Sequence, residues 1–228
     1  MTRRTADEHT SSVEDYLKTI YELEREGSAA ATNEIADRLS IASASVSGML
    51  RRLADQGLLE HERYRGARLT DEGRRVALGT IRRHRIIEVY LVQALGYPWD
   101  RVHEEAERLE HAASDELVDR MAAAVGEPTV DPHGAPIPTR EGEIYEGEYL
   151  SLADLDPGEA GRLLRVEDDD PAFLRYLDSL ELAIGTRLSV HSRAPFDGPV
   201  VLTIEAEGGT REASVGRRVA RALKVERV

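Results

Sequence analysis

The chain has 228 residues, enough for two or three domains of ordinary size, and it contains no cysteine. Disulfides and thiolate ligands are therefore excluded, so any metal must be held by His, Asp and Glu. The first residues show no apolar run after their charges, and no stretch approaches the ~18 apolar residues of a membrane span. We therefore expect a cytoplasmic protein with no membrane partner.

The net charge of −13 is unevenly distributed. Residues 1–75 hold 12 basic and 14 acidic side chains, whereas the rest of the chain holds 18 and 29. The acidity thus lies mostly outside the N-terminal third, which leaves that third able to approach DNA phosphates.

Hydrophobic periodicity predicts helices over 11–26, 32–39 and 43–56, followed by a two-stranded ribbon over 58–70 that turns near Arg65. This is the order of a winged helix-turn-helix, which we assign to residues 1–74. Further helices are expected at about 71–94, 100–111 and 115–125. They make a helical domain over 75–127, whose surplus of apolar positions predicts a two-fold homodimer.

A Pro/Gly-rich linker is predicted over 128–147. Beyond it, short β-like runs at 163–167, 186–193, 199–207 and 224–228 alternate with turns and with one helix over 170–182. Residues 148–228 therefore read as a small β-barrel, and the whole chain as an α+β protein.

Six His and Glu side chains recur at helical spacing in the second domain. They are His84, Glu88, His103, Glu107, Glu110 and His111. Side chains four residues apart share one face of a helix, and imidazole with carboxylate suits Zn, Mn, Fe, Co or Ni. A solvated charged face has the same spacing, so both interpretations stay open at this point.

Hydroxyls and arginines of the third helix and the ribbon are candidates for contacting DNA. They are Ser43, Ser45, Ser47, Arg51, Arg52, Arg63 and Arg65. Small hydroxyls let a helix approach base edges, and arginines on a wing can hold phosphates. The alternative is that the serines cap the helix and the arginines are solvated, because winged helices also serve as protein-protein modules.

Long stretches of the chain are similar to one known family. They include EDYLKTIYELE (14–24), IADRLSIASASVSGMLRRLADQGLL (35–59), VHEEAERLEH (102–111) and DPHGAPIP (131–138). Across nearly its full length the chain resembles the diphtheria-toxin-repressor family of iron- and manganese-dependent regulators. The resemblance implies a winged helix-turn-helix, a helical dimerisation and metal-binding domain and an SH3-like third domain.

The resemblance also implies two metal positions. Asp15, which its pattern alone presents as an ordinary first-turn acid, would join Glu107, Glu110 and His111 in the first. The second would use His84, Glu88 and His103. Two ligands from the third domain would align near Asp169 and Ala172, and alanine cannot ligate.

Two departures bear on the choice of metal. Iron-type members have methionine and cysteine where this chain has Asp15 and Glu107, as manganese-type members do. Manganese-type members, however, often lack the third domain and carry a carboxylate where this chain has Lys18. Ligation by oxygen and nitrogen alone favours Mn²⁺ over Fe²⁺.

The expected function is a metal-dependent repressor of metal-uptake genes. We expect a homodimer that binds a double-stranded DNA operator when Mn²⁺ or Fe²⁺ is present, with no enzymatic activity and no small-molecule substrate. One alternative is a carboxylate/histidine metalloenzyme, which would need an open coordination position and a substrate pocket. Another is a metal-independent winged-helix regulator.

Overall fold

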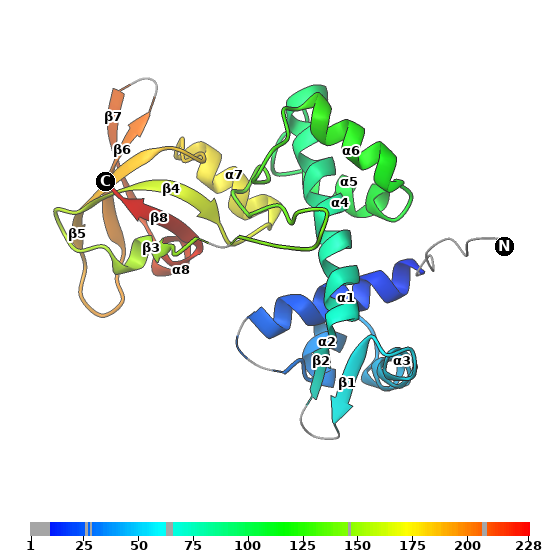
Figure 1. Ribbon diagram of the computed structural model, residues 1–228. Coiled ribbons are helices and arrows are strands. Elements are labelled where there is room, and N and C mark those ends of the chain that lie inside the picture. Colours follow the sequence, from blue (N-terminus) through cyan, green and yellow to red (C-terminus); the bar gives the residue numbers. More distant parts are fainter. Residues whose placement is uncertain (1–9, 26, 28, 63–65, 146, 207–208) are drawn as a thin grey trace. The chain divides into compact units, whose positions relative to one another are not determined.

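The chain divides into two compact units, which Figure 1 displays in a computed structural model. The structure describes residues 10–25, 27, 29–62, 66–145, 147–206 and 209–228. The first unit comprises Met1–His84, Glu110–Ala112 and Pro138–Ile144, and the second comprises Arg85–Leu109, Ala113–Ile137 and Tyr145–Val228.

The first unit is built from three helices, a hairpin and the beginning of a long helix. In chain order these are α1 (Ser11–Arg25), α2 (Thr32–Arg38), α3 (Ser43–Asp55), β1 (Leu59–Glu62), β2 (Gly66–Leu69) and the first half of α4 (Asp71–Leu95). The hairpin is antiparallel and pairs Leu59 with Leu69. This is the winged helix-turn-helix order that the sequence predicted.

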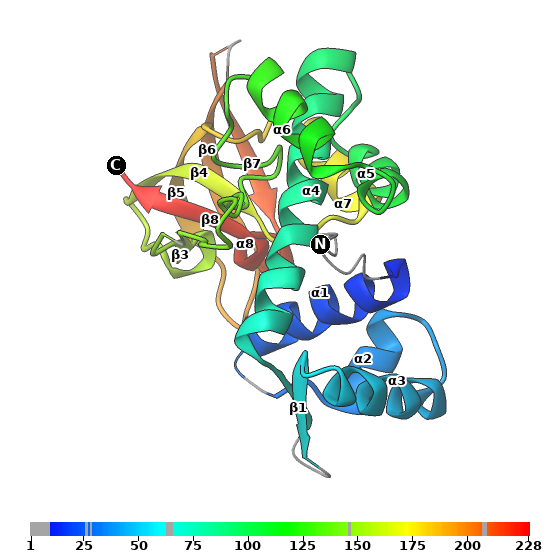
Figure 2. The same ribbon diagram turned by 45° about the vertical axis from the view of Figure 1, so that its right-hand side comes forward.

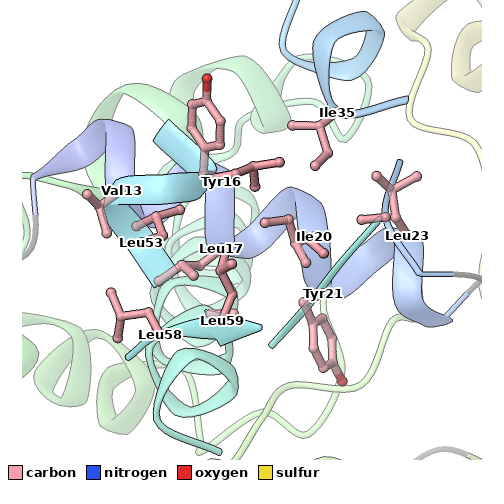
Figure 3. Close-up of a cluster of buried hydrophobic side chains, with 14 of the residues drawn as sticks. Val13, Tyr16, Leu17, Ile20, Tyr21, Leu23, Ile35, Leu53, Leu58 and Leu59 are labelled. Carbon is pink, nitrogen blue, oxygen red and sulfur yellow. The ribbon is translucent and has the colours of Figure 1, made fainter. Parts of the chain in front are cut away.

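Helix α1 supplies the centre of the apolar core of this unit. Its buried side chains Val13, Leu17 and Ile20 recur at helical spacing and form an apolar stripe along one face of α1. Leu53 of α3 and Ile35 of α2 pack against that face (Figure 3). Because this core is close-packed, a displacement of α1 would also displace α3.

The start of α4 is tied to the hairpin by a threonine cap and a close approach. The Thr70 hydroxyl accepts the backbone N–H of Gly73 at 3.1 Å and donates to the carbonyl of Gly57 at 2.8 Å. A Cβ on Gly73 would lie 1.8 Å from the carbonyl oxygen of Leu58, so only glycine fits there. The wing and α4 are thus held in one body.

The helical part of the second unit contains the rest of α4, all but the last residue of α5 (Val102–Glu110), and α6 (Asp115–Ala124). Its core includes Ile86 and Val89 of α4, packed with Val118 of α6. Helix α5 begins two residues later than expected, because Asp100 belongs to the preceding turn and pairs with Arg175 at 3.1 Å.

The C-terminal part of the second unit is a six-stranded antiparallel sheet curled around its own apolar core (Figures 1 and 2). The strands run in the order β3 (Leu150–Ser151), β8 (Leu223–Arg227), β4 (Ala160–Val166), β5 (Arg187–Arg193), β6 (Val200–Ala206) and β7 (Gly209–Val215). Its helices are η1 (Leu152–Asp154), α7 (Pro171–Ser179) and α8 (Arg217–Ala222). The sequence predicted β4, α7, β5, β6 and β8, but not β3, β7 or α8.

The Pro/Gly-rich loop around residues 131–136 packs closely on β4 within the second unit. Gly134 has φ +85°, and a Cβ on it would lie 1.9 Å from the carbonyl oxygen of Leu164. The carbonyl of His133 accepts the N–H of Val166 at 2.8 Å. This part of the predicted linker is thus an ordered contact that fixes the side chains around it.

No helix among the described residues combines the length and apolar character that crossing a bilayer requires.

Candidate metal centre and DNA-reading surface

Asp15, Glu110 and His111 meet within the first unit. Nε2 of His111 lies 2.8 Å from Oδ1 of Asp15 and 3.4 Å from Oε1 of Glu110. One ligand atom from each of the three residues lies within 4.8 Å of the others. Asp15 is thus more than a first-turn acid, because it faces His111 from a helix 96 positions earlier in the chain.

Glu14 orients the imidazole of this cluster. Its Oε2 lies 2.6 Å from Nδ1 of His111, and its Oε1 accepts a hydrogen bond from Arg83. Arg83 also donates to the backbone carbonyl of Glu110 at 3.1 Å. A neutral His111 that donates Nδ1–H to Glu14 points the lone pair of Nε2 at Asp15 and Glu110. Metal-binding histidines are held in this way, and periodicity alone gave Glu14 no role.

The surrounding charges shift the pKa values of the half-buried His111 and the buried Glu110. Burial lowers the pKa of His111, but the hydrogen bond to Glu14 and the charges of Asp15 and Glu110 outweigh it, so the pKa is raised. Burial raises the pKa of Glu110, but the hydrogen bond with His84 and the charge of Lys18 outweigh it, so the pKa is lowered. The carboxylate of Glu110 is therefore ionised at neutral pH.

The spacing of these donors fits a divalent transition metal. Ligand bonds of ~2.0–2.2 Å at tetrahedral or right angles place two donor atoms roughly 3.0–3.5 Å apart. The separations of 2.8 and 3.4 Å around Nε2 of His111 are close to that range. Two carboxylates and one imidazole make a hard, negatively charged donor set.

His84 belongs to the same neighbourhood. Its Nδ1 lies 2.6 Å from Oε2 of Glu110, and both side chains are almost wholly buried. The sequence grouped His84 with Glu88 and His103, which follow in the second unit. Glu88 is one turn further along α4.

A second cluster lies within the second unit. Nδ1 of His103 is 3.3 Å from Oε1 of Glu88, while its Nε2 is 3.8 Å from Glu107 and 3.6 Å from Asp169. The predicted third-domain carboxylate Asp169 thus reaches His103. Ala172 has no side-chain ligand atom, and its backbone N–H donates to the carboxylate of Asp170, which caps α7.

Sequence reasoning missed two buried residues beside Glu88. Asp131 and His133 each offer a ligand atom that, with Glu88, lies within a 4.8 Å set. Nε2 of His133 donates to the carbonyl of Trp99 at 3.0 Å, which leaves Nδ1 facing Oε2 of Glu88 at 4.0 Å. Burial and the charge of Glu88 raise the pKa of Asp131. Both residues stand in the quoted DPHGAPIP stretch, but a loop has no helical spacing to signal ligands.

Helix α3 carries most of the residues predicted to contact DNA. Ser43, Ser45, Arg51 and Arg52 are exposed on it. Ser47 is half-buried and its hydroxyl donates to the carbonyl of Ser43 at 3.1 Å. Arg63 and Arg65 lie outside the described residues.

A pocket of about 540 Å³ connects α3 with α1. Its lining includes Ser45, Gly48 and Arg52 of α3, together with Asp15 and Tyr16 of α1. One side chain, Asp15, therefore belongs both to the metal cluster and to the surface next to the reading helix.

A winged helix-turn-helix whose first helix supplies a carboxylate to a His/Glu cluster defines a metal-dependent DNA-binding regulator. A model described as "Iron dependent repressor, N-terminal DNA binding domain" matches residues 8–67. One described as "Iron dependent repressor, metal binding and dimerisation domain" matches residues 70–139, and a FeoA domain model matches 150–227.

Relatives of known function extend over nearly the whole chain. The iron-dependent repressor IdeR of Mycobacterium leprae is 31% identical over 95% of this chain and 97% of its own. The diphtheria toxin repressor of Corynebacterium efficiens is 33% identical over 84% and 86%. The chain therefore belongs to the diphtheria-toxin-repressor family of metal-dependent, DNA-binding transcriptional repressors, which are not enzymes.

Solved structures agree in fold along nearly the full chain. A manganese-dependent transcriptional repressor in complex with manganese is 37% identical and has a TM-score of 0.85, covering 95% of this chain and 100% of that one. The repressor ScaR with bound Cd²⁺ is 31% identical with a TM-score of 0.79, covering 95% and 99%. The predicted fold class and metal-dependent repressor function are confirmed by these structures and relatives, and the DNA partner and the homodimer by the matching domain models.

Proposed function

We propose that Mn²⁺ activates this repressor at a centre formed by Asp15, Glu110 and His111. The observation that carries the proposal is the convergence of these three donors around Nε2 of His111, with Glu14 holding the imidazole. We include Glu107, one turn before His111 in the sequence, as a further ligand. The metal supplies positive charge to a cluster whose donors are all oxygen and nitrogen, and this favours Mn²⁺ over Fe²⁺.

A second metal position is proposed around Glu88, His103 and Asp169. The contact of His103 with both carboxylates supports it. Asp131 and His133 extend the donor set on the other side of Glu88. His84, one turn before Glu88 on α4, is assigned to the first centre by its contact with Glu110 and to the second by its helical spacing.

The link from metal to DNA runs through α1. Its carboxylate Asp15 faces the cluster, while Leu17 on its apolar face packs in the core that includes Leu53 of α3. Closing the cluster therefore fixes the helix against which the reading helix rests, and a metal that binds this arrangement better shifts the population toward it. In a dimer, two reading helices held ~34–36 Å apart match successive major grooves.

The proposed dimer face lies on the helical part of the second unit. Leu95 of α4 and Leu117 of α6 are exposed there, and a second copy of the chain could bury them. We place the winged helix at 1–74, the helical domain at 75–127, the linker at 128–147 and the third domain at 148–228. The protein is proposed to act in the cytoplasm on genes for metal uptake.

The test is metal-dependent operator binding by the purified chain, with Mn²⁺, Fe²⁺, Zn²⁺ or no metal at matched salt and without oxygen. Asp15→Asn and His111→Gln should abolish the Mn²⁺ response, whereas Glu22→Gln, a carboxylate of α1 paired with Arg38, should leave it intact. Asp15→Met should move the preference toward Fe²⁺. A wild type that answers to Fe²⁺ at a lower free concentration than Mn²⁺ would contradict the proposed metal.

A further inference from the structure

A lysine side chain enters the metal cluster from α1. Nζ of Lys18 lies 3.1 and 3.3 Å from the two oxygens of Glu110 and 3.4 Å from Nδ1 of His84. The Lys18 side chain is only 12% exposed and that of Glu110 is fully buried. The ammonium thus contacts one carboxylate and one imidazole. These are the same two types of metal ligand that Asp15 faces in Glu110 and His111.

The two oxygens of Glu110 have different neighbours. Oε1 lies 3.4 Å from Nε2 of His111, beside Asp15, whereas Oε2 lies 2.6 Å from Nδ1 of His84. A carboxylate with a histidine at each oxygen has the arrangement to bridge two cations. In this chain the cation that contacts Glu110 and His84 is the ammonium of Lys18.

The positive charge of Lys18 affects metal binding at Glu110. A fully buried carboxylate is costly unless a positive charge compensates it, and Lys18 provides that charge. A divalent ion bonded to Oε1 of Glu110 at ~2.2 Å would stand at most about 5.5 Å from the ammonium. Two cations so close in a partly buried site repel each other strongly. The ammonium therefore opposes the first ion and leaves no place for a second.

We propose that Lys18 is a built-in cation of this centre, which limits it to one divalent ion and raises the metal concentration needed to fill it. The proposal rests on the function proposed above, in which Asp15, Glu110 and His111 hold the metal. Lys18 also stabilises the metal-free protein, because it neutralises Glu110 when no ion is bound.

The experiment is a calorimetric titration of the metal-free full-length chain with Mn²⁺ alone, together with its metal-free thermal melting. Lys18→Gln should bind Mn²⁺ at least about tenfold more tightly, and its metal-free form should melt at a lower temperature. Lys18→Glu should take up one more Mn²⁺ per chain than the wild type. Lys18→Arg, which keeps the charge, should keep the wild-type stoichiometry.

The matched control is Lys224→Gln. Lys224 is the other lysine of the chain and pairs with Glu167 in the third domain, so its loss changes the net charge equally. If Lys18→Gln melts earlier but binds Mn²⁺ like Lys224→Gln, and Lys18→Glu gains no ion, Lys18 is an ordinary ion pair and the inference is wrong. A wild type that binds no Mn²⁺, or binds it equally well after His111→Gln, would instead overturn the proposed function.

Discussion

Replacing Glu14 by Gln tests whether the orientation of His111, and not only its presence, sets metal affinity. Glu14 lies 2.6 Å from Nδ1 of His111, and both side chains are less than a fifth exposed, so water screens their hydrogen bond poorly. The amide of Gln can donate to Nδ1 as well as accept from it. The variant therefore no longer fixes which ring nitrogen carries the proton.

The expected loss of Mn²⁺ affinity in Glu14→Gln follows from what is known of groups that orient metal-binding histidines. Loss of a group that orients a metal-binding histidine lowers affinity ~10–100-fold, which is ~1.4–2.7 kcal/mol. Because this bond is short and shielded, we expect the middle of that range, about 30-fold or ~2 kcal/mol. Arg83 keeps its bonds to the carbonyl of Glu110 and the hydroxyl of Thr80, so the fold should survive.

The assay is a calorimetric Mn²⁺ titration of wild type, Glu14→Gln and Glu22→Gln. Glu22 is an exposed carboxylate of the same helix that pairs with Arg38 at 3.6 Å, so the control changes the charge of α1 without touching the cluster. Far-ultraviolet circular dichroism checks that the helices are intact. An affinity of Glu14→Gln within about twofold of both references would refute the orienting role.

Other expected outcomes concern pH, DNA and assembly. Although burial lowers it, the pKa of His111 is raised by the neighbouring carboxylates, so a proton competes with the metal; Mn²⁺ affinity should rise as pH increases through that pKa, and His111→Gln should show a flatter pH profile. The stability of the metal-free protein should instead fall as pH rises. Protonated His111 stabilises the fold below its unfolded pKa, and this stabilisation is lost as pH rises through the folded pKa. Melting temperatures of the metal-free protein, measured against pH, check this. Arg52→Ala should weaken binding to all operators alike and reduce the salt slope by about one, whereas Ser45→Ala should change the preference among operators, as competition binding would reveal. Leu117→Arg should convert the dimer to a monomer in sedimentation, and a persisting dimer would exclude this part of the proposed face.

Local pattern determined the elements of this protein, because each helix carries its own signal. The spacing of Val13, Leu17 and Ile20 predicts α1 without any knowledge of its partners, and the same holds for α3 and α4. Strands β3 and β7 were missed, because β3 has only two residues and β7 presents mostly exposed or half-buried polar side chains.

The proposed metal ligands also divide into those that a local pattern reveals and those that only the folded chain reveals. His103, Glu107 and His111 could be found because helical spacing places them together, and the family resemblance added Asp15 and Asp169. Only the tertiary structure brought Glu14 into the cluster, and Asp131 and His133 beside Glu88. The resemblance had marked Lys18 as a departure, but its contact with Glu110 came from the fold. Contacts between segments as far apart as Lys18 and Glu110 leave no periodic trace in the sequence, because packing of the whole unit, and not the local conformation of either segment, decides which side chains meet.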